Sequence, residues 1–111
     1  MTGDLYTNLL REEALEAEDI CRLQTLYPAT AKQIREQVEQ ECDRMEYAGS
    51  RMFDEMPDAV MVRRQAGEIA AMAGADQEPW GEDMARILLV DEMHRRRSRY
   101  RRHRSWRGYS W

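Results

Sequence analysis

Residues 28–56, PATAKQIREQVEQECDRMEYAGSRMFDEM, carry the pattern that most restricts how this chain can fold. Apolar side chains recur there every three or four residues, which at about 100° per residue places them on one face of a helix. The pattern predicts a long amphipathic helix over residues 30–56. Gly49 lies on the apolar face, and a glycine within a helix costs about 1 kcal/mol relative to alanine, so it indicates a close helix crossing or a break. The predicted apolar face comprises Ile34, Val38, Cys42, Met45, Gly49, Met52, Phe53 and Met56, and the polar face comprises Glu36, Glu39, Asp43, Ser50 and Asp54.

Three further segments have helical character. Residues 2–27 are rich in Leu, Glu and Ala and predict one broken or two short helices, ending near Pro28 because proline disfavours helical backbone in the preceding residue. Residues 58–73 predict a helix whose small side chains let a neighbour approach closely. A last helix is predicted to begin near PWGED, residues 79–83, and to run past Val90 into an arginine-rich end without support from a core. The predicted buried faces are Ala59, Val62, Ala66, Ile69 and Ala73 in residues 58–73, and Trp80, Met84, Ile87 and Leu88 in the last helix.

The composition favours an all-α fold. The chain has 111 residues, enough for one hydrophobic core and too few for two. Hydrophobic residues make up 42% and charged residues 34%, with only 6 Gly and 3 Pro, which is typical of a charged helical bundle. We therefore predict a small helical bundle of four or five helices with a basic C-terminal extension. Its core is expected to form from residues 2–27, 30–56 and 58–73 and the start of the last helix.

The charge is divided between two parts of the chain. Residues 1–94 contain 21 acidic and 9 basic side chains, a net charge of −12, whereas residues 95–111 contain eight Arg and no acidic residue, a net charge of +8. We divide the chain accordingly into an acidic helical body, residues 1–94, and an Arg- and aromatic-rich tail, residues 95–111. A charge difference of this kind between a body and an end is typical of a tail that binds polyanions or protein surfaces.

The cysteines and the N-terminus bear on location. Two cysteines, Cys21 and Cys42, are too few for the disulfide framework of a small secreted domain, and we expect both to be reduced and to behave as small buried hydrophobes. The N-terminus MTGDLYTNLL has no apolar signal region, and no run approaches the roughly 20 apolar residues that cross a bilayer. These observations predict a cytoplasmic protein without a transmembrane segment.

No pattern of catalytic or metal-binding residues is present. Cys21, Cys42, His94 and His103 are not spaced as paired ligands of a zinc ion. Asp91 lies three residues before His94, but the di-metal sites of helical bundles require Glu and His at this spacing on two helices. The glycines are isolated and form no phosphate-binding loop. We predict no metal, no cofactor and no enzymatic activity.

The tail carries the strongest functional signal. Its guanidinium groups can pair with phosphates, and its aromatic rings can stack on unpaired bases, which predicts contact with RNA, single strands or another polyanion. The alternative is a structural or assembly protein whose cationic tail docks on acidic protein surfaces, including its own body or another copy, and a homo-oligomer is then possible. An anionic membrane surface, and a tail without a specific role, are further alternatives. The predicted polyanion-binding residues are Arg95, Arg96, Arg97, Arg99, Tyr100, Arg101, Arg102, Arg104, Trp106 and Arg107.

The methionines at 45, 52 and 56 are interpreted as core residues in preference to an adaptable binding groove, and Tyr47 is the one residue outside the helical pattern. The segment ECDRMEYAGSRMFDEMPD, residues 41–58, resembles a stretch found in short bacterial proteins of uncharacterised function. The resemblance covers this segment alone and implies a bacterial, intracellular setting, with no activity or binding residues.

Overall fold

The structure is a computed structural model that describes the backbone of residues 2–106 and the side chains of residues 5–104. No strand occurs in this part of the chain, and the predicted all-α fold is confirmed, with four α-helices joined by short loops and one 3-10 turn. The elements are α1 (Thr2–Gln24), α2 (Ala29–Met45), η1 (Arg51–Phe53), α3 (Ala59–Met72) and α4 (Gly81–Trp106).

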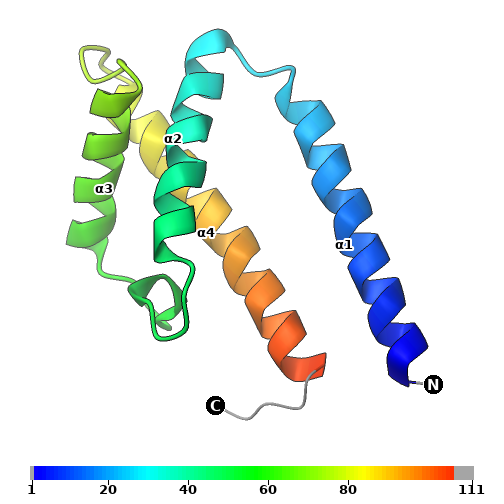
Figure 1. The fold of residues 1–111 in the computed structure, drawn as a ribbon. Helices are drawn as coiled ribbons and strands as arrows, with labels where there is room; N and C mark the ends of the chain where they lie inside the picture. The colour runs from blue at the N-terminus through cyan, green and yellow to red at the C-terminus, as the bar shows by residue number, and fades with distance from the viewer. Residues whose placement is uncertain (1, 107–111) are drawn as a thin grey trace.

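Helices α2, α3 and α4 pack together, and α1 lies at the edge of the molecule. Figure 1 shows α2 between α3 and α1, with α4 crossing behind α2 toward the N-terminal end of α1. Most close approaches between elements join α4 to α3 and α2, whereas α1 makes few. The Cα atoms span 54 × 31 × 17 Å, so the molecule is long and thin.

The hydrophobic core lies within the α2–α3–α4 unit. Ile34, Val38 and Cys42 of α2 are fully buried, as the periodicity of residues 28–56 predicted. Small side chains on α3 let this helix pack closely against α4. The remaining buried apolar residues of the core cluster are Met52, Val62, Ala66, Ile69, Ala70, Ala75, Ala85, Leu89 and Met93.

The prediction of one long helix over residues 30–56 is wrong in its second half. Helix α2 ends at Met45, and Gly49 adopts a left-handed φ of +82°, a conformation that glycine adopts without strain. Ser50 then starts η1, because its side chain accepts a hydrogen bond from the backbone N–H of Met52. Met52 is still buried, but Met56 is 84% exposed because it lies beyond this turn.

The start of α3 agrees with the prediction, whereas the buried face of α4 does not. Asp58 is the N-cap of α3, and its Oδ1 accepts a hydrogen bond of 2.8 Å from the N–H of Val60. The sequence predicted Trp80 and Ile87 to be buried, but they are 40% and 68% exposed. The buried positions are instead Ala85, Leu89 and Met93, four residues apart, so the true face is rotated around the helix.

Helix α1 departs from the prediction in two respects. It is one continuous helix, not a broken or double one. Its described side chains, residues 5–24, also add no apolar residue to the core cluster, because the only buried one among them is Gln24. Leu5, Leu15 and Leu23 are each more than half exposed. The predicted contribution of residues 2–27 to the core is therefore wrong.

Helix α4 continues through residue 94 and includes the first part of the tail. The prediction that this part lacks support from a core is wrong, because Met93 and Arg96 are buried against the α2–α3–α4 unit. The ring of Tyr100 stacks on that of Phe53, with centroids 4.2 Å apart and planes at 23°. These contacts support the helix as far as its sixth turn.

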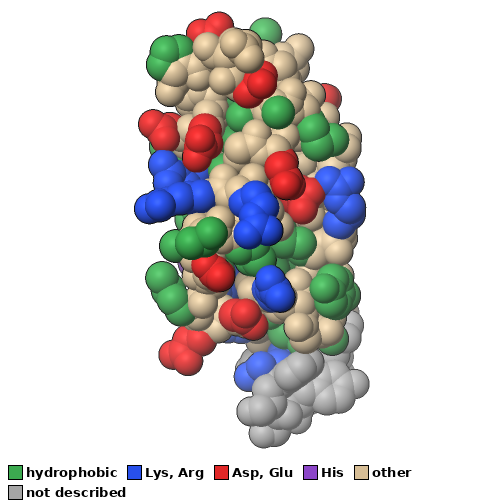
Figure 2. Space-filling view, turned by 90° about the vertical axis from the view of Figure 1, so that its left-hand side faces the viewer, with side chains coloured by type: hydrophobic (Ala, Val, Ile, Leu, Met, Phe, Trp, Pro, Cys, Tyr) green, Lys and Arg blue, Asp and Glu red, His purple; other side chains and the backbone are tan. Residues whose placement is uncertain are grey.

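The surface carries charges of both signs. Figure 2 shows the face on the α3 side, where acidic, basic and apolar side chains are interspersed and neither charge forms a continuous patch. None of the helices in residues 2–106 combines the length and the apolar character that crossing a membrane requires.

Candidate functional site

Arg96 lies where the tail meets the acidic body, and it is only 8% exposed. Its Nε donates to Glu92 on the same helix, at 2.8 Å, and its Nη1 donates to Asp43 of α2, at 2.7 Å. Glu46, just after α2, lies 3.6 Å from the same Nη1. We name Arg96, Glu92, Asp43 and Glu46 the Arg96 cluster; it joins α4 to the C-terminal end of α2.

The Arg96 cluster is electrostatically balanced. Burial by itself would lower the pKa of the Arg96 guanidinium, but hydrogen bonds with Glu92 and Asp43 outweigh burial and raise that pKa above its ordinary value. Arg96 therefore remains protonated at neutral pH and well above it. A buried charge is tolerated only where it is paired, so this arginine and its carboxylates depend on one another.

Neighbouring residues of the tail also contact the body. Arg99 donates through Nη2 to Glu46 at 2.8 Å, and Arg97 donates to the backbone carbonyl of Glu55 at 3.1 Å. The Arg99 and Glu46 side chains are 50% and 34% exposed. Ion pairs with this much solvent contact contribute little stability, about 0 to 1 kcal/mol.

Six residues further along α4, Arg102 and His103 both pair with Glu13 of α1. Arg102 donates to Oε2 through Nη2 at 2.8 Å and through Nε at 3.0 Å. His103 lies 2.6 Å from Oε1 through Nε2, which must be the donor because an ionised carboxylate only accepts. The other ring nitrogen of His103 lies 3.1 Å from the Tyr6 hydroxyl, and the two rings meet edge to face. Glu13, Arg102, His103 and Tyr6 form the Glu13 cluster.

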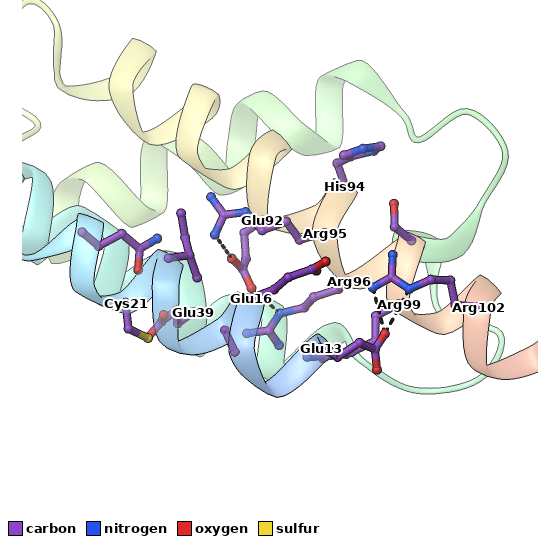
Figure 3. A pocket seen from close by; sticks show the side chains of 14 residues that line it. Glu13, Glu16, Cys21, Glu39, Glu92, His94, Arg95, Arg96, Arg99 and Arg102 are labelled. Carbon is purple, nitrogen blue, oxygen red and sulfur yellow. Dashed lines mark hydrogen bonds and ion pairs between the residues drawn. The ribbon is translucent and has the colours of Figure 1, made fainter. Parts of the chain in front are cut away.

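A cleft of about 510 Å³ separates α1 from α4 between these two clusters. Figure 3 shows side chains from both helices projecting into it, with Glu13 joined to Arg102 and Glu92 joined to Arg95. Ala17 and Ile20 of α1 supply an apolar part of its wall. Its charged lining residues are balanced in sign: Glu13, Glu16, Glu39 and Glu92 against Arg95, Arg96, Arg99 and Arg102. This balance does not favour a small anion or a small cation, and it favours interactions between helices.

The pKa of Glu13 predicts how α1 responds to acid. Burial alone would raise this pKa, but the hydrogen bonds from His103 and Arg102 outweigh it and hold the pKa below its ordinary value of 4.5. Ionised Glu13 therefore stabilises the folded chain above pH 4.5, and this contribution is lost as the pH falls through the depressed value. We expect Glu13→Gln to lower the midpoint of thermal unfolding at pH 7 and to have a progressively smaller effect as the pH falls below 4.5.

Glu12 offers a matched control for this pH series. It precedes Glu13 on α1, is exposed, and makes no ion pair with any of the described residues. Glu12→Gln removes the same charge and should change the unfolding midpoint little at either pH. An equal effect of the two substitutions at pH 7 would show that net charge, and not the Glu13 cluster, governs the response.

The structure places the predicted polyanion-binding residues in different environments. Arg96, Arg97, Arg99 and Arg102 contact the acidic body, as described above, and Arg95 pairs with Asp91 and Glu92 of its own helix. Tyr100 is partly buried against Phe53, and Arg104 is also partly buried. Arg101 is exposed. The side chain of Trp106 and the whole of Arg107 lie outside the described residues.

The sequence did not identify the residues that receive these arginines. Asp43 lies on the polar face of the predicted helix, and nothing in its spacing marks it as a partner. Glu13 follows Leu9 by four residues on the apolar face of α1, which marks a partly buried carboxylate without naming its partner. One signal was available for Arg96, since it continues the four- and three-residue spacing of Leu89 and Met93 along the buried face of α4. That spacing predicts a partly buried arginine, although it does not predict its partners.

The cysteines have contrasting environments. Cys42 is fully buried, as predicted, and burial raises the pKa of its thiol to about 12. Cys21 was predicted to be buried and is instead exposed beside the cleft. Among the described residues, no three His, Cys, Asp or Glu side chains gather in an arrangement that could hold a metal ion.

Comparisons of the chain with protein families, with curated proteins and with solved structures give no match.

Proposed function

We propose that this chain is a small non-enzymatic protein that assembles with acidic helical surfaces through the arginines of its tail. The observation that carries the proposal is the docking of α1. Glu13 receives both Arg102 and His103, while α1 adds no apolar side chain to the core cluster. Contacts with charged groups therefore set the position of this helix relative to the α2–α3–α4 unit.

The same contacts suit an acidic helix from another protein molecule. A carboxylate at the position of Glu13 accepts two hydrogen bonds from Arg102, and such paired contacts fix the orientation of the two groups. The side chains of Arg99 and Arg102 are 50% and 43% exposed, so a carboxylate of another protein can replace Glu46 or Glu13 as their partner at little cost in free energy. An intracellular setting is part of this proposal.

A second function, contact of the tail with RNA or single-stranded DNA, is favoured by one observation. Arg101 is exposed on the described part of the tail, between residues whose exposed ion pairs are weak. A phosphate backbone could therefore replace Glu13 and Glu46 as the partner of these arginines. Each phosphate contact on a single strand would add about 0.7 to the salt dependence of binding.

One binding experiment separates the two functions. The protein is titrated with a fluorescent polyglutamate peptide and with a single-stranded RNA of equal length over a series of salt concentrations. We expect the triple substitution of Arg99, Arg101 and Arg102 to Gln to weaken polyglutamate binding at least tenfold at low salt. Triple substitution of Arg51, Arg63 and Arg64, which lie outside the tail, removes the same charge and serves as the control.

The outcomes are distinct. Tighter binding of polyglutamate than of RNA, lost only in the tail variant, supports assembly with acidic proteins. Tighter binding of RNA, with the salt slope reduced by about 2 in the tail variant, supports the nucleic-acid function instead. Equal losses in the tail variant and in the control contradict both functions, because binding then follows net charge alone.

A further inference from the structure

Helix α1 exposes apolar side chains on both sides of the face that it turns toward α4. At 100° per residue, Leu5 and Leu23 lie on one flank of this face and Leu10 lies on the other. They are 54%, 52% and 43% exposed, although helix α1 has a neighbour along this side. The face itself comprises Tyr6, Leu9, Glu13, Ile20 and Gln24, which are all partly or fully buried.

The chain exposes more surface than a compact protein of its size. Its accessible surface is 7753 Å², whereas a compact monomer of 13.2 kDa exposes about 6,400 Å². Its radius of gyration is 15.8 Å, compared with about 13 Å for a compact domain of this length.

The polar contacts between α1 and α4 centre on Glu13 and Tyr6. They include the hydrogen bonds of Glu13 with Arg102 and His103, and the hydrogen bond and ring contact of Tyr6 with His103. A second copy of the chain offers the same Arg102 and His103 to the same Glu13. Exchange of α1 between two copies therefore loses none of these contacts.

We infer that two copies of this chain exchange α1, so that Glu13 of each copy pairs with Arg102 and His103 of the other. This inference rests on the proposed function, and it names a second copy as the partner. Charge complementarity supports that choice, since α1 carries six acidic and two basic residues and the described part of the tail carries seven arginines.

The connection between α1 and α2 suits such an exchange. Only Thr25, Leu26, Tyr27 and Pro28 join the two helices, and Leu26 is 79% exposed. The structure shows that this connection lets α1 reach its own α4. Because it is short, its length sets the balance between folding back and exchange, and lengthening it favours folding back. The exchanged pair has twofold symmetry, with each α1 making the same contacts.

Crosslinking in the full-length chain tests the inference. Cys21 of α1 and Ser98 of α4 both line the cleft, so Ser98→Cys supplies a second thiol facing the first. Cys42 is fully buried and does not compete for the reagent. A short bifunctional maleimide is added at several protein concentrations, and the products are separated under denaturing conditions. We expect mostly crosslinked dimers, and we expect light scattering of the unsubstituted chain to give twice the mass of one chain.

A variant with a longer connection is the matched control. Four Gly and Ser residues inserted between Leu26 and Tyr27 let α1 fold back on its own chain, so the crosslink should shift from between chains to within one chain. Crosslinks confined to single chains at every concentration in the Ser98→Cys protein overturn the exchange, and so does a monomeric mass of the unsubstituted chain. If polyglutamate binding still depends on Arg99, Arg101 and Arg102 in that case, the proposed function stands and only the exchange fails.

Discussion

Replacement of Arg96 by methionine is expected to lower the free energy of unfolding by about 2 to 4 kcal/mol. Removal of one partner of a fully buried ion pair costs about 3 to 5 kcal/mol, because the remaining charge stays in a poorly solvated position. In this variant the remaining charge is that of Glu92, whose side chain is only 18% exposed and which keeps one contact, with Arg95. Asp43 remains 69% exposed and stays hydrated, which makes the expected loss smaller. Urea unfolding followed by circular dichroism measures the change.

Two comparisons show whether the buried pairing causes this loss. Arg95→Met removes an arginine from the same turn, but its side chain is 35% exposed, so the expected loss is below about 1 kcal/mol. Addition of Glu92→Gln to Arg96→Met removes the unpaired charge and should recover part of the stability. Equal losses for Arg95→Met and Arg96→Met would mean that the Arg96 cluster adds nothing specific to the fold.

Replacement of Leu89 by alanine is expected to cost about 3 kcal/mol. Leu89 is fully buried on α4, where this helix packs against both α2 and α3. Truncation removes the transfer free energy of its methyl groups and leaves a cavity that the rigid helices fill only in part, and the usual range for such changes is about 2 to 5 kcal/mol. The same urea experiment gives the change, and an unaltered slope shows that the unfolded chain is unchanged.

Leu15→Ala in α1 is the counterpart. Leu15 is 57% exposed, on the side of α1 away from Glu13, and alanine is a slightly better helix former, so stability should change by less than about 0.5 kcal/mol. A loss close to that of Leu89→Ala would contradict the assignment of the core to the α2–α3–α4 unit.

Local sequence patterns predicted the elements better than they predicted their packing. The helical periodicity of residues 28–56 identified Ile34, Val38 and Cys42 as core residues. The periodicity did not locate the end of α2. Met52 occupies a position that fits the helical pattern and is buried, although the chain reaches it through a left-handed turn at Gly49 and not through a helix. Periodicity measures spacing, and a compact turn can preserve spacing.

The position of α1 shows a different limit. Leu5, Leu9, Ile20 and Leu23 recur as they do in a core helix, so the sequence predicted burial. Whether such a face is covered depends on what the other helices present, and the part of α4 beside α1 presents mainly arginines. Nothing in residues 2–27 contains that information.

The sequence predicted which residues of the candidate site are charged, but it did not predict which arginine pairs with which carboxylate. The contrast between residues 1–94 and residues 95–111 gave the carboxylates of the body as one alternative partner for the arginines of the tail, beside nucleic acid. The choice of Glu13 for Arg102 and of Asp43 for Arg96 follows from the crossing of α4 over α2 and toward α1. Glu13 and Arg102 lie 89 residues apart in the chain, and Asp43 and Arg96 lie 53 residues apart. No local sequence pattern connects residues at such separations.

The burial of Cys42 has a consequence for the chemistry of the protein under oxidising conditions. Thiolates, and not thiols, react with peroxides and disulfides, and a thiol with a pKa of about 12 is almost entirely protonated at neutral pH. Cys21 is exposed, so oxidants and glutathione reach it while the helices remain folded. Oxidation of the folded protein should therefore stop at one cysteine, and damage at the second would mark molecules in which α2 and α4 have separated.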